Sequence, residues 1–286
     1  MSRVPFRVRL AVPVGSVRAR AGWLLEGSEG WGEFSPLPSW SAQEREAALR
    51  AATEAATTPF PEPVRERVDV CALVPLVAPS VARRIAVESG CRTIKIKIGD
   101  DASEARVQAV RDALPGVRIR LDANGSWDEE SALAALRIFA RYELEYVEDP
   151  VPTMDALARV RRRSSVPVAA EACVRTIEDA RRLRRLEAAD VLVLKPQRIG
   201  GVDAALAAAE EAGVPAVPSS ALETSVGLAA VLAVAAALGE LPFAAGVGTA
   251  SLLEKDVVVD PLLPADGTLV PRRPQLDLTA LTEPVA

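Results

Sequence analysis

Five segments decide the fold: TIKIKI (93–98), VRIRLDA (117–123), LEYVED (144–149), VPVAAEA (166–172) and ADVLVLK (189–195). Each is rich in β-branched or other apolar residues, which is typical of buried strands. Stretches of Ala, Arg, Leu and Glu with helical periodicity separate them, and the segments begin about 25 residues apart. A strand, a three-turn helix and two short loops need about that length. The pattern therefore predicts repeated strand–helix units.

The same rhythm extends in both directions along the chain. VDVCALV (68–74) precedes the five segments, and VPAVPSS (214–220) and FAAGVG (243–248) follow them. Parallel strands need crossover helices, and seven or eight such units predict an α/β fold, a closed (β/α) barrel of the TIM type. The alternative is an open, doubly wound sheet, which usually carries a glycine-rich phosphate loop after its first strand. The segment after Cys71 reads ALVPLVAPS, so the barrel is favoured.

The beginning of the chain has a different pattern, with two strand candidates that could pair in antiparallel fashion and one helix. These are VRLAVPV (8–14), VRARAGWLLEG (17–27) and a helical stretch at 41–57. We expect an α+β capping domain over residues 1–66 and a catalytic barrel domain over 67–254. The tail, 255–286, has strand and turn signals and is expected to complete the capping domain.

Composition narrows the class of protein. The net charge of −5, without a basic cluster interleaved with aromatics, argues against a nucleic-acid partner. The N-terminus lacks a leader pattern and the longest apolar run, 226–238, is too short to span a bilayer, so we expect no membrane association. Three widely spaced cysteines fit reduced thiols and a cytoplasmic location. Arginine runs at 161–163 and 181–185 are expected on the solvated exterior, and the oligomeric state is left open.

The basic residues are unusual in kind. The chain has no histidine, which excludes Ser-His-Asp and Cys-His catalysis and His-ligated zinc. Of its 34 basic residues only four are lysines: Lys95, Lys97, Lys195 and Lys255. Lysine can lose its proton when its pKa is lowered, whereas arginine in practice cannot. A lysine in this chain is therefore a candidate for proton chemistry.

Charged side chains fall at the carboxyl ends of the predicted strands, where the active site of a parallel barrel lies. Lys95 and Lys97 share one face of their strand and isoleucines take the other, so the lysines are expected to point into the barrel. The next four strands end in polar groups: Asp122 and Asn124, Glu148 and Asp149, Glu171, and Lys195. A single acid at a strand end is more often an N-cap, and KIKIG alone could be a polar barrel layer. The whole constellation favours a site.

Three buried acids repel one another, and a divalent cation resolves the repulsion. Oxygen ligands from Asp122, Glu148 and Glu171 favour Mg²⁺, with Mn²⁺ also possible, over zinc. A metal flanked by amines suits removal of a proton from the carbon next to a substrate carboxylate. The residues therefore predict a small-molecule carboxylate as substrate and a lysine as the base.

Four motifs resemble those of the enolase superfamily, in its muconate-lactonizing-enzyme-like branch: KIK (95–97), LDAN (121–124), VEDP (147–150) and LVLKP (192–196). The resemblance covers essentially the whole chain, the capping domain included. It implies a role for each matching residue: Lys97 as an acid/base, Lys195 as the lysine on the opposite face, Asp122 and Glu148 as metal ligands, Lys95 as an auxiliary lysine, and Asn124 as a supporting group.

The third ligand departs from the family pattern. The family usually has Asp-Glu-Ser at this strand end, whereas this chain has AAEACVRT (169–176). Aligning the VRT that follows places Glu171 at the aspartate and Ala172 at the glutamate. A carboxylate one methylene longer is retained, so metal binding by Glu171 is still implied.

Two further segments are similar to the o-succinylbenzoate synthase family within this branch: GWGEFSPLPSWS (30–41) and SSALETSVG (219–227). That likeness implies a lyase that removes water, in a syn sense, from 2-succinyl-6-hydroxy-2,4-cyclohexadiene-1-carboxylate in menaquinone synthesis. The family reaction uses Mg²⁺, removal of the α-proton and a metal-stabilised enediolate. The likeness to this family also implies substrate contacts or supporting roles for four residues: Arg120, Ser219, Ser220 and Gly246.

Three other readings stay open. An N-acylamino-acid racemase or dipeptide epimerase of the same branch would use Lys97 and Lys195 as bases on opposite faces. A class I aldolase-like barrel would use Lys195 as a Schiff-base lysine, although the three aligned acids count against it. A non-catalytic barrel would have lost a metal ligand, and Glu171 is the position to test.

Overall fold

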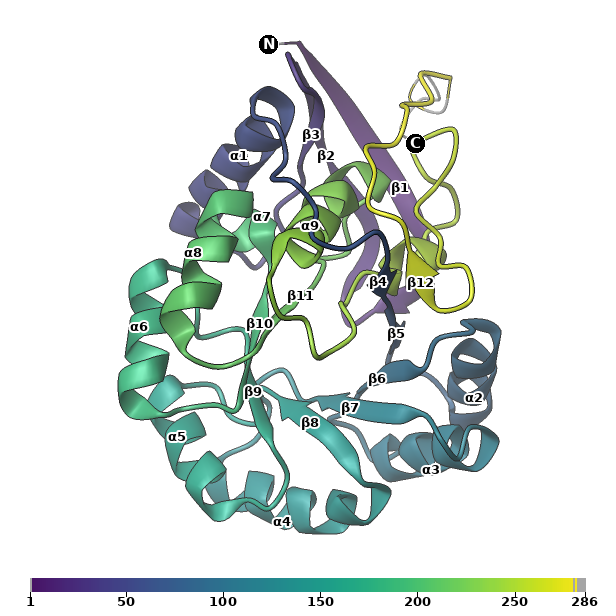
Figure 1. Cartoon of the computed structure of the whole chain (residues 1–286). Helices are drawn as coiled ribbons and strands as arrows, with labels where there is room; N and C mark the ends of the chain where they lie inside the picture. The colour runs from purple at the N-terminus through teal and green to yellow at the C-terminus, as the bar shows by residue number, and fades with distance from the viewer. Residues whose placement is uncertain (1, 280, 282–286) are drawn as a thin grey trace.

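The computed structural model describes residues 2–279 and 281. Its centre is a seven-stranded sheet that curls in sequence order from β5 to β11, with helices on its outer side (Figure 1). Every neighbouring pair of these strands is parallel, which confirms the predicted (β/α) architecture. The strands are β5 (Cys71–Val74), β6 (Thr93–Lys97), β7 (Arg118–Asp122), β8 (Leu144–Glu148), β9 (Val168–Ala170), β10 (Val191–Leu194) and β11 (Ala216–Pro218).

The predicted eighth strand, FAAGVG, is reduced to two bridging residues. Ala245 pairs with Val70 and Gly246 pairs with Ser219, both in the parallel sense. Because Val70 precedes β5 and Ser219 follows β11, this short segment joins the two edges of the sheet and closes the barrel. Close packing requires the glycine, since a Cβ at Gly246 would lie 2.3 Å from the Ser219 hydroxyl oxygen.

Strand β6 explains why its lysines face inward. Ile94, Ile96 and Ile98 are buried in the main core between the sheet and its helices. Successive side chains of a strand point to opposite faces, so Lys95 and Lys97 lie on the inner face, as predicted. The surrounding helices are α2 (Pro79–Glu88), α3 (Ser103–Ala113), α4 (Glu129–Phe139), η1 (Ala140–Tyr142), α5 (Met154–Arg163), α6 (Ile177–Leu186), α7 (Pro196–Ile199), α8 (Val202–Ala212), α9 (Ser225–Ala237) and η2 (Gly248–Leu252).

The beginning of the chain forms a three-stranded antiparallel sheet and a helix that lie beside the barrel (Figure 1). Helix α1 begins with a capping box, in which Ser41 and Glu44 satisfy each other's backbone N–H groups. We call this assembly the capping unit; it comprises β1 (Arg3–Val14), β2 (Val17–Gly27), β3 (Gly30–Phe34) and α1 (Ala42–Thr57).

The C-terminal tail contacts both parts of the molecule (Figure 1). Strand β12 (Thr268–Leu269) pairs with β4 (Val68–Asp69) next to the barrel. Other tail residues share a small apolar core with the capping unit: Val257, Val258 and Leu276 pack with Phe6, Val8 and Leu24. The exact boundaries expected above, 1–66, 67–254 and 255–286, stay a prediction.

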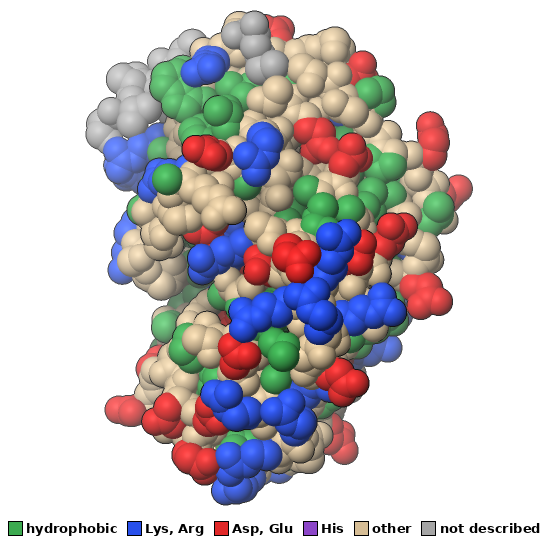
Figure 2. Space-filling view, turned by 90° about the vertical axis from the view of Figure 1, so that its left-hand side faces the viewer, with side chains coloured by type: hydrophobic (Ala, Val, Ile, Leu, Met, Phe, Trp, Pro, Cys, Tyr) green, Lys and Arg blue, Asp and Glu red, His purple; other side chains and the backbone are tan. Residues whose placement is uncertain are grey.

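The arginine runs lie on the outer helices among acidic partners. Arg181 of α6 pairs with Glu211 of α8 at 2.9 Å, and Arg182 pairs with Asp155 of α5 at 2.6 Å. Figure 2 shows basic and acidic side chains interspersed on one face of the molecule, so these runs belong to a solvated exterior. Among the described helices, none has the length and apolar character that a membrane span needs.

Candidate active site

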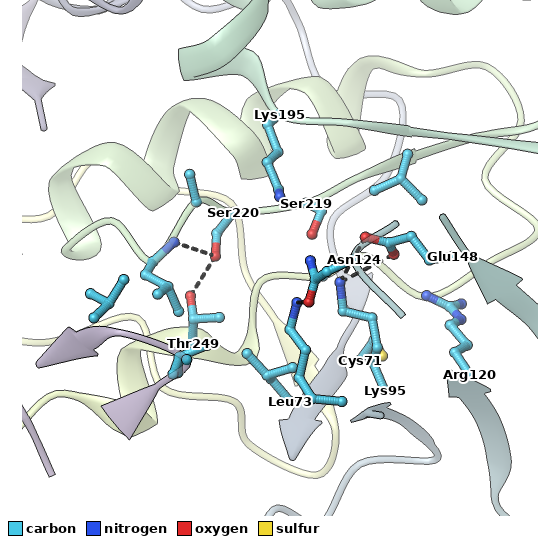
Figure 3. Close-up of a pocket in the computed structure, with 18 of the residues that line it drawn as sticks. Cys71, Leu73, Lys95, Arg120, Asn124, Glu148, Lys195, Ser219, Ser220 and Thr249 are labelled. Carbon is cyan, nitrogen blue, oxygen red and sulfur yellow. Dashed lines mark hydrogen bonds and ion pairs between the residues drawn. The ribbon is translucent and has the colours of Figure 1, made fainter. Parts of the chain in front are cut away.

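A pocket of about 260 Å³ opens at the carboxyl ends of the barrel strands (Figure 3). That volume is close to the lower end of ordinary small-molecule pockets, about 300 Å³. Most of the residues singled out from the sequence line it: Lys95, Lys97, Arg120, Asn124, Glu148, Lys195, Ser219, Ser220 and Gly246. Asp122 and Glu171 lie beneath this surface and contact the pocket lysines. The structure therefore brings all the predicted site residues together.

One wall of the pocket, which we call the β6 wall, carries two lysines from a single strand. Lys97 Nζ donates to Asp122 Oδ2 and to Asn124 Oδ1, each at 2.7 Å. Lys95 Nζ lies 3.2 Å from Asp122 Oδ2 and 3.1 Å from Glu148 Oε2. Parallel register places Lys97 beside Asp122 and Asp122 beside Glu148, so neighbouring strands deliver these groups to one edge.

The opposite wall, which we call the β10 wall, carries a different arrangement. Lys195 enters the pocket from the side opposite Lys95 (Figure 3) and donates to Glu171 Oε2 at 2.8 Å. Arg198 of α7 donates to Glu171 Oε1 at 2.7 Å and to Glu44 Oε1 of the capping unit at 2.6 Å. Both oxygens of the Glu171 carboxylate are thus held by cations, and the second cation is anchored by α1.

The carboxylates between the two walls are buried and crowded. Oxygens of Glu148, Asp149 and Glu171 lie within 4.8 Å of one another. Burial, reinforced by Asp122, raises the pKa of Glu148. Burial also acts to raise the pKa of Glu171, but Lys195 and Arg198 outweigh it and bring that pKa down to about 2. The site therefore concentrates negative charge that neighbouring cations must balance.

The sequence placed Asp149 beside Glu148 at a strand end but gave it no role in the site. Its carboxylate accepts from the backbone N–H groups of Glu171 at 2.9 Å and Ala172 at 2.8 Å. Asp149 itself has a φ of 42°, a strained value for a residue other than glycine. Since both its oxygens are used in this way, Asp149 holds the end of β9 in place. Burial, with Glu171 and Glu148 nearby, raises the pKa of Asp149 to about 8.

Arg198 and Glu44 were also missed from the sequence. They lie 154 positions apart in the chain, so no local motif connects them. One oxygen of Glu44 belongs to the capping box with Ser41 at the start of α1. Its second oxygen serves the barrel, and only the docking of α1 against α7 reveals that role.

Arg120 is buried on the strand next to that of Lys95 and lies beside this lysine (Figure 3). Its Nε donates to Glu145 Oε2 at 2.5 Å, and its guanidinium lies 4.8 Å from the centre of the Tyr146 ring. Higher in the pocket, Ser220 shares a 2.6 Å hydrogen bond with Thr249. These groups form a polar floor and side on which an acidic ligand could be oriented.

The residues present fit a divalent cation. Oxygens of the buried Glu148, Asp149 and Glu171, at the ends of β8 and β9, lie within 4.8 Å of one another, and the buried Asp122 of β7 shares Lys95 with Glu148. Carboxylate oxygens are the donors that Mg²⁺ and Mn²⁺ prefer. Like charges in a low-dielectric site are costly unless a cation balances them, and the lysines and Arg198 already supply part of that balance.

Comparisons with known proteins agree with this geometry. Residues 78–276 match the family model "Enolase C-terminal domain-like", and residues 3–56 match "Enolase N-terminal domain-like". A curated o-succinylbenzoate synthase from Thermobifida fusca (strain YX) is 50% identical over 98% of this chain and 89% of its own length. The chain belongs to the o-succinylbenzoate synthase family of the enolase superfamily.

Other relatives support the same family and fold. The o-succinylbenzoate synthase of Mycolicibacterium smegmatis is 41% identical, over 98% of this chain and 89% of that protein. Among solved structures, the muconate lactonizing enzyme of Pseudomonas fluorescens superposes with a TM-score of 0.87 at 21% identity, covering 98% of this chain and 96% of that one. The L-Ala-D/L-Glu epimerase of Bacillus subtilis gives 0.83 at 21% identity, with 96% of each chain covered. At these identities the solved structures speak for the fold alone.

Proposed function

We propose that this chain is a lyase that removes one molecule of water from 2-succinyl-6-hydroxy-2,4-cyclohexadiene-1-carboxylate and so forms o-succinylbenzoate. The 50% identity to a curated o-succinylbenzoate synthase is the observation that carries this proposal, and Lys97 and Lys195, which both line the pocket, are the groups that the reaction would use. A role in menaquinone synthesis in the cytoplasm is part of the same proposal.

Lys97 is the proposed acid/base. Its Nζ, as a free amine, would take the proton from the carbon that bears the substrate carboxylate. The same nitrogen would then donate that proton to the departing hydroxyl group, which leaves as water from the same face. The C–H and C–O bonds break, a ring double bond forms, and the gain of aromaticity makes the second half favourable. Asp122 and Asn124, each 2.7 Å from Nζ, hold the amine in position.

Lys195 is proposed to act as a cation from the opposite face. Its ammonium would stabilise negative charge on the substrate without exchanging a proton. Burial lowers the pKa of Lys195, but Glu171 and Glu148 together raise it by more, so the net shift favours the charged form. That electrostatic role suits a group fixed in a water-poor pocket.

Asp122, Glu148 and Glu171 are the proposed ligands of a magnesium ion. When bound, the ion supplies positive charge for the substrate carboxylate as the α-proton leaves. Lys95, which contacts Asp122 and Glu148, would balance the remaining charge of the ligands. Ser219 and Ser220 are proposed to bind the succinyl carboxylate, while Arg120 and Gly246 shape the floor and the side of the pocket.

The test is the ultraviolet change that accompanies aromatisation of the cyclohexadiene substrate, recorded with Mg²⁺ and with excess EDTA. We expect turnover with Mg²⁺ and none with EDTA. A parallel incubation of an N-succinylamino acid in D₂O measures exchange at its α-carbon. Exchange there without aromatisation of the cyclohexadiene would replace the proposed function by that of a racemase.

A further inference from the structure

A buried polar cluster joins the capping unit to the turn that follows β11. This turn, residues 219–224, is called the pocket turn, and its first four residues line the pocket. Two capping-unit residues face it: Arg20 of β2, with a relative exposure of 2%, and Glu33 of β3, with 3%. Neither belongs to the machinery described above.

Arg20 holds the most strained residue of the pocket turn. Leu222 has a φ of 67°, in the left-handed region that a leucine rarely adopts. Its carbonyl oxygen accepts from Arg20 Nε at 3.0 Å. The other end of the guanidinium donates to the backbone and hydroxyl oxygens of Ser35 on the capping unit. One guanidinium therefore ties the carbonyl group of Leu222 to Ser35 of the capping unit.

Glu33 holds the last residue of the pocket turn, Thr224. Its carboxylate accepts from the Thr224 backbone N–H at 3.0 Å and from the Thr224 hydroxyl at 2.5 Å. It also accepts from the Gly227 N–H at 3.1 Å, so it binds backbone N–H groups at the start of α9 that have no partner within the helix. Within the turn, Glu223 accepts from the Ala221 N–H at 2.5 Å. The second half of the pocket turn is thus fixed by the capping unit at Leu222 and Thr224 and braced internally by Glu223.

We propose that Arg20 and Glu33 are positioning residues for the substrate, which hold the pocket turn in the shape that binds the ligand end distant from Lys97. The proposal rests on the proposed function for the identity of the ligand. The docking of the capping unit and the shape of the pocket are then one event, because the same hydrogen bonds serve both. Charge supports this pairing, since the guanidinium is attracted by two buried acids, Glu33 and Glu223.

The first test is steady-state kinetics of Arg20→Met in the full-length chain. We expect KM to rise at least tenfold while kcat changes less than threefold, because Lys97 and the carboxylates are untouched. Mg²⁺ affinity measured by calorimetry is expected to stay within twofold. Arg20→Lys keeps the positive charge but loses the paired donors of the guanidinium, so its KM should lie between those of the wild type and Arg20→Met. Arg9→Met, on the exposed face of the same sheet, is the matched control and should leave KM unchanged.

A double-mutant cycle with Leu222→Gly separates positioning from general support of the fold. Glycine adopts a positive φ without strain, so the turn no longer needs Arg20 to hold it there. Arg20→Met should therefore raise KM by less than threefold in the Leu222→Gly background. An equal rise in both backgrounds, or a fall in kcat with KM unchanged, would overturn the proposal.

Hydrogen exchange gives a readout that does not need turnover. In Arg20→Met and in Glu33→Gln, the amides of Ala221 and Thr224 should exchange at least tenfold faster, while those of β6 keep the wild-type rate. Unchanged exchange in the pocket turn would contradict the positioning role in either variant. If wild-type enzyme shows no turnover yet the turn loosens as expected, the proposed function fails and the positioning of the turn stands.

Discussion

The two walls of the pocket present lysines to the same space but are built differently. On the β6 wall, Lys95 and Lys97 contact Asp122, Asn124 and Glu148, which come from the two strands that follow in the barrel. On the β10 wall, Arg198 holds Glu171 and is itself anchored by Glu44 of the capping unit. After β11, the pocket turn is anchored by Arg20 and Glu33. The contacts of the first wall lie within the barrel, whereas the second wall is also hydrogen-bonded to the capping unit.

The largest expected effect breaks the symmetry between the two lysines. Lys97→Arg should lower kcat by about 10² to 10⁴-fold, because arginine cannot give up a proton to act as a base. Lys195→Arg keeps a positive charge on the opposite wall and should lower kcat by a smaller factor. Both rates are measured by aromatisation, with circular dichroism to show that the fold survives. Near-normal turnover in Lys97→Arg would remove it from the role of base.

The next effect concerns the unusual ligand position on the β10 wall. Glu171→Gln should weaken Mg²⁺ binding at least about tenfold, since a charged oxygen donor is lost. Glu171→Asp restores the residue usual in the family and keeps the charge, so it is the matched control and should bind Mg²⁺ more tightly than the glutamine variant. Calorimetry with Mg²⁺ alone measures both. Equal affinities of wild type and Glu171→Gln would exclude Glu171 as a ligand.

A smaller effect should appear in the pH dependence of stability. Burial and the neighbouring Glu223 raise the pKa of Glu33 to about 7, against hydrogen bonds from Ser35 and Thr224 and the charge of Arg20. A raised carboxyl pKa means that the folded state binds a proton the unfolded state has lost. The contribution of this group to stability is therefore complete below about pH 4.5 and is lost as the pH rises through about 7.

Chemical denaturation at pH values between 4.5 and 7 tests this. Titration of the Glu33 carboxyl would lower the free energy of unfolding by an amount on the order of 1.4 kcal/mol per pH unit across that interval. Glu33→Gln cannot titrate, so its stability should fall less steeply with pH than that of the wild type. Glu26→Gln, on the exposed side of the same sheet, is the control and should follow the wild-type slope. Parallel curves for wild type and Glu33→Gln would contradict the expectation.

The smallest effect comes from a second place where the capping unit completes a barrel helix. Helix α8 begins after Gly201, which has no side chain to cap it, and Glu54 of α1 accepts from the N–H groups of Val202 at 2.6 Å and Asp203 at 3.0 Å. Glu54→Ala should lower the free energy of unfolding by about 1 kcal/mol, the usual cost of losing an N-cap. Glu46→Ala, exposed on the same helix, should change it little. Denaturant titration measures the free energy of unfolding of both variants. Equal values would show that Glu54 does not stabilise the start of α8.

The strand pattern predicted most of the barrel because each strand carries its own signal. Alternation in TIKIKI placed Lys95 and Lys97 on the inner face, and parallel register then aligned Asp122 and Glu148 beside them. The eighth strand was predicted too long. Its closing contacts need only Ala245 and Gly246, and a single pair of bridges leaves no periodic pattern to read.

The sequence by itself determined the chemistry that the pocket can perform, because a chain with no histidine and few lysines leaves few candidates for a base. It also determined the alternation of strands and helices along the chain, since hydrophobic periodicity is local. Only the tertiary structure decided how Arg20, Glu33 and Glu44 reach the barrel, and how Asp149 holds the end of β9. Those contacts join side chains whose partners are fixed by the packing of whole elements, and no spacing along the chain encodes them.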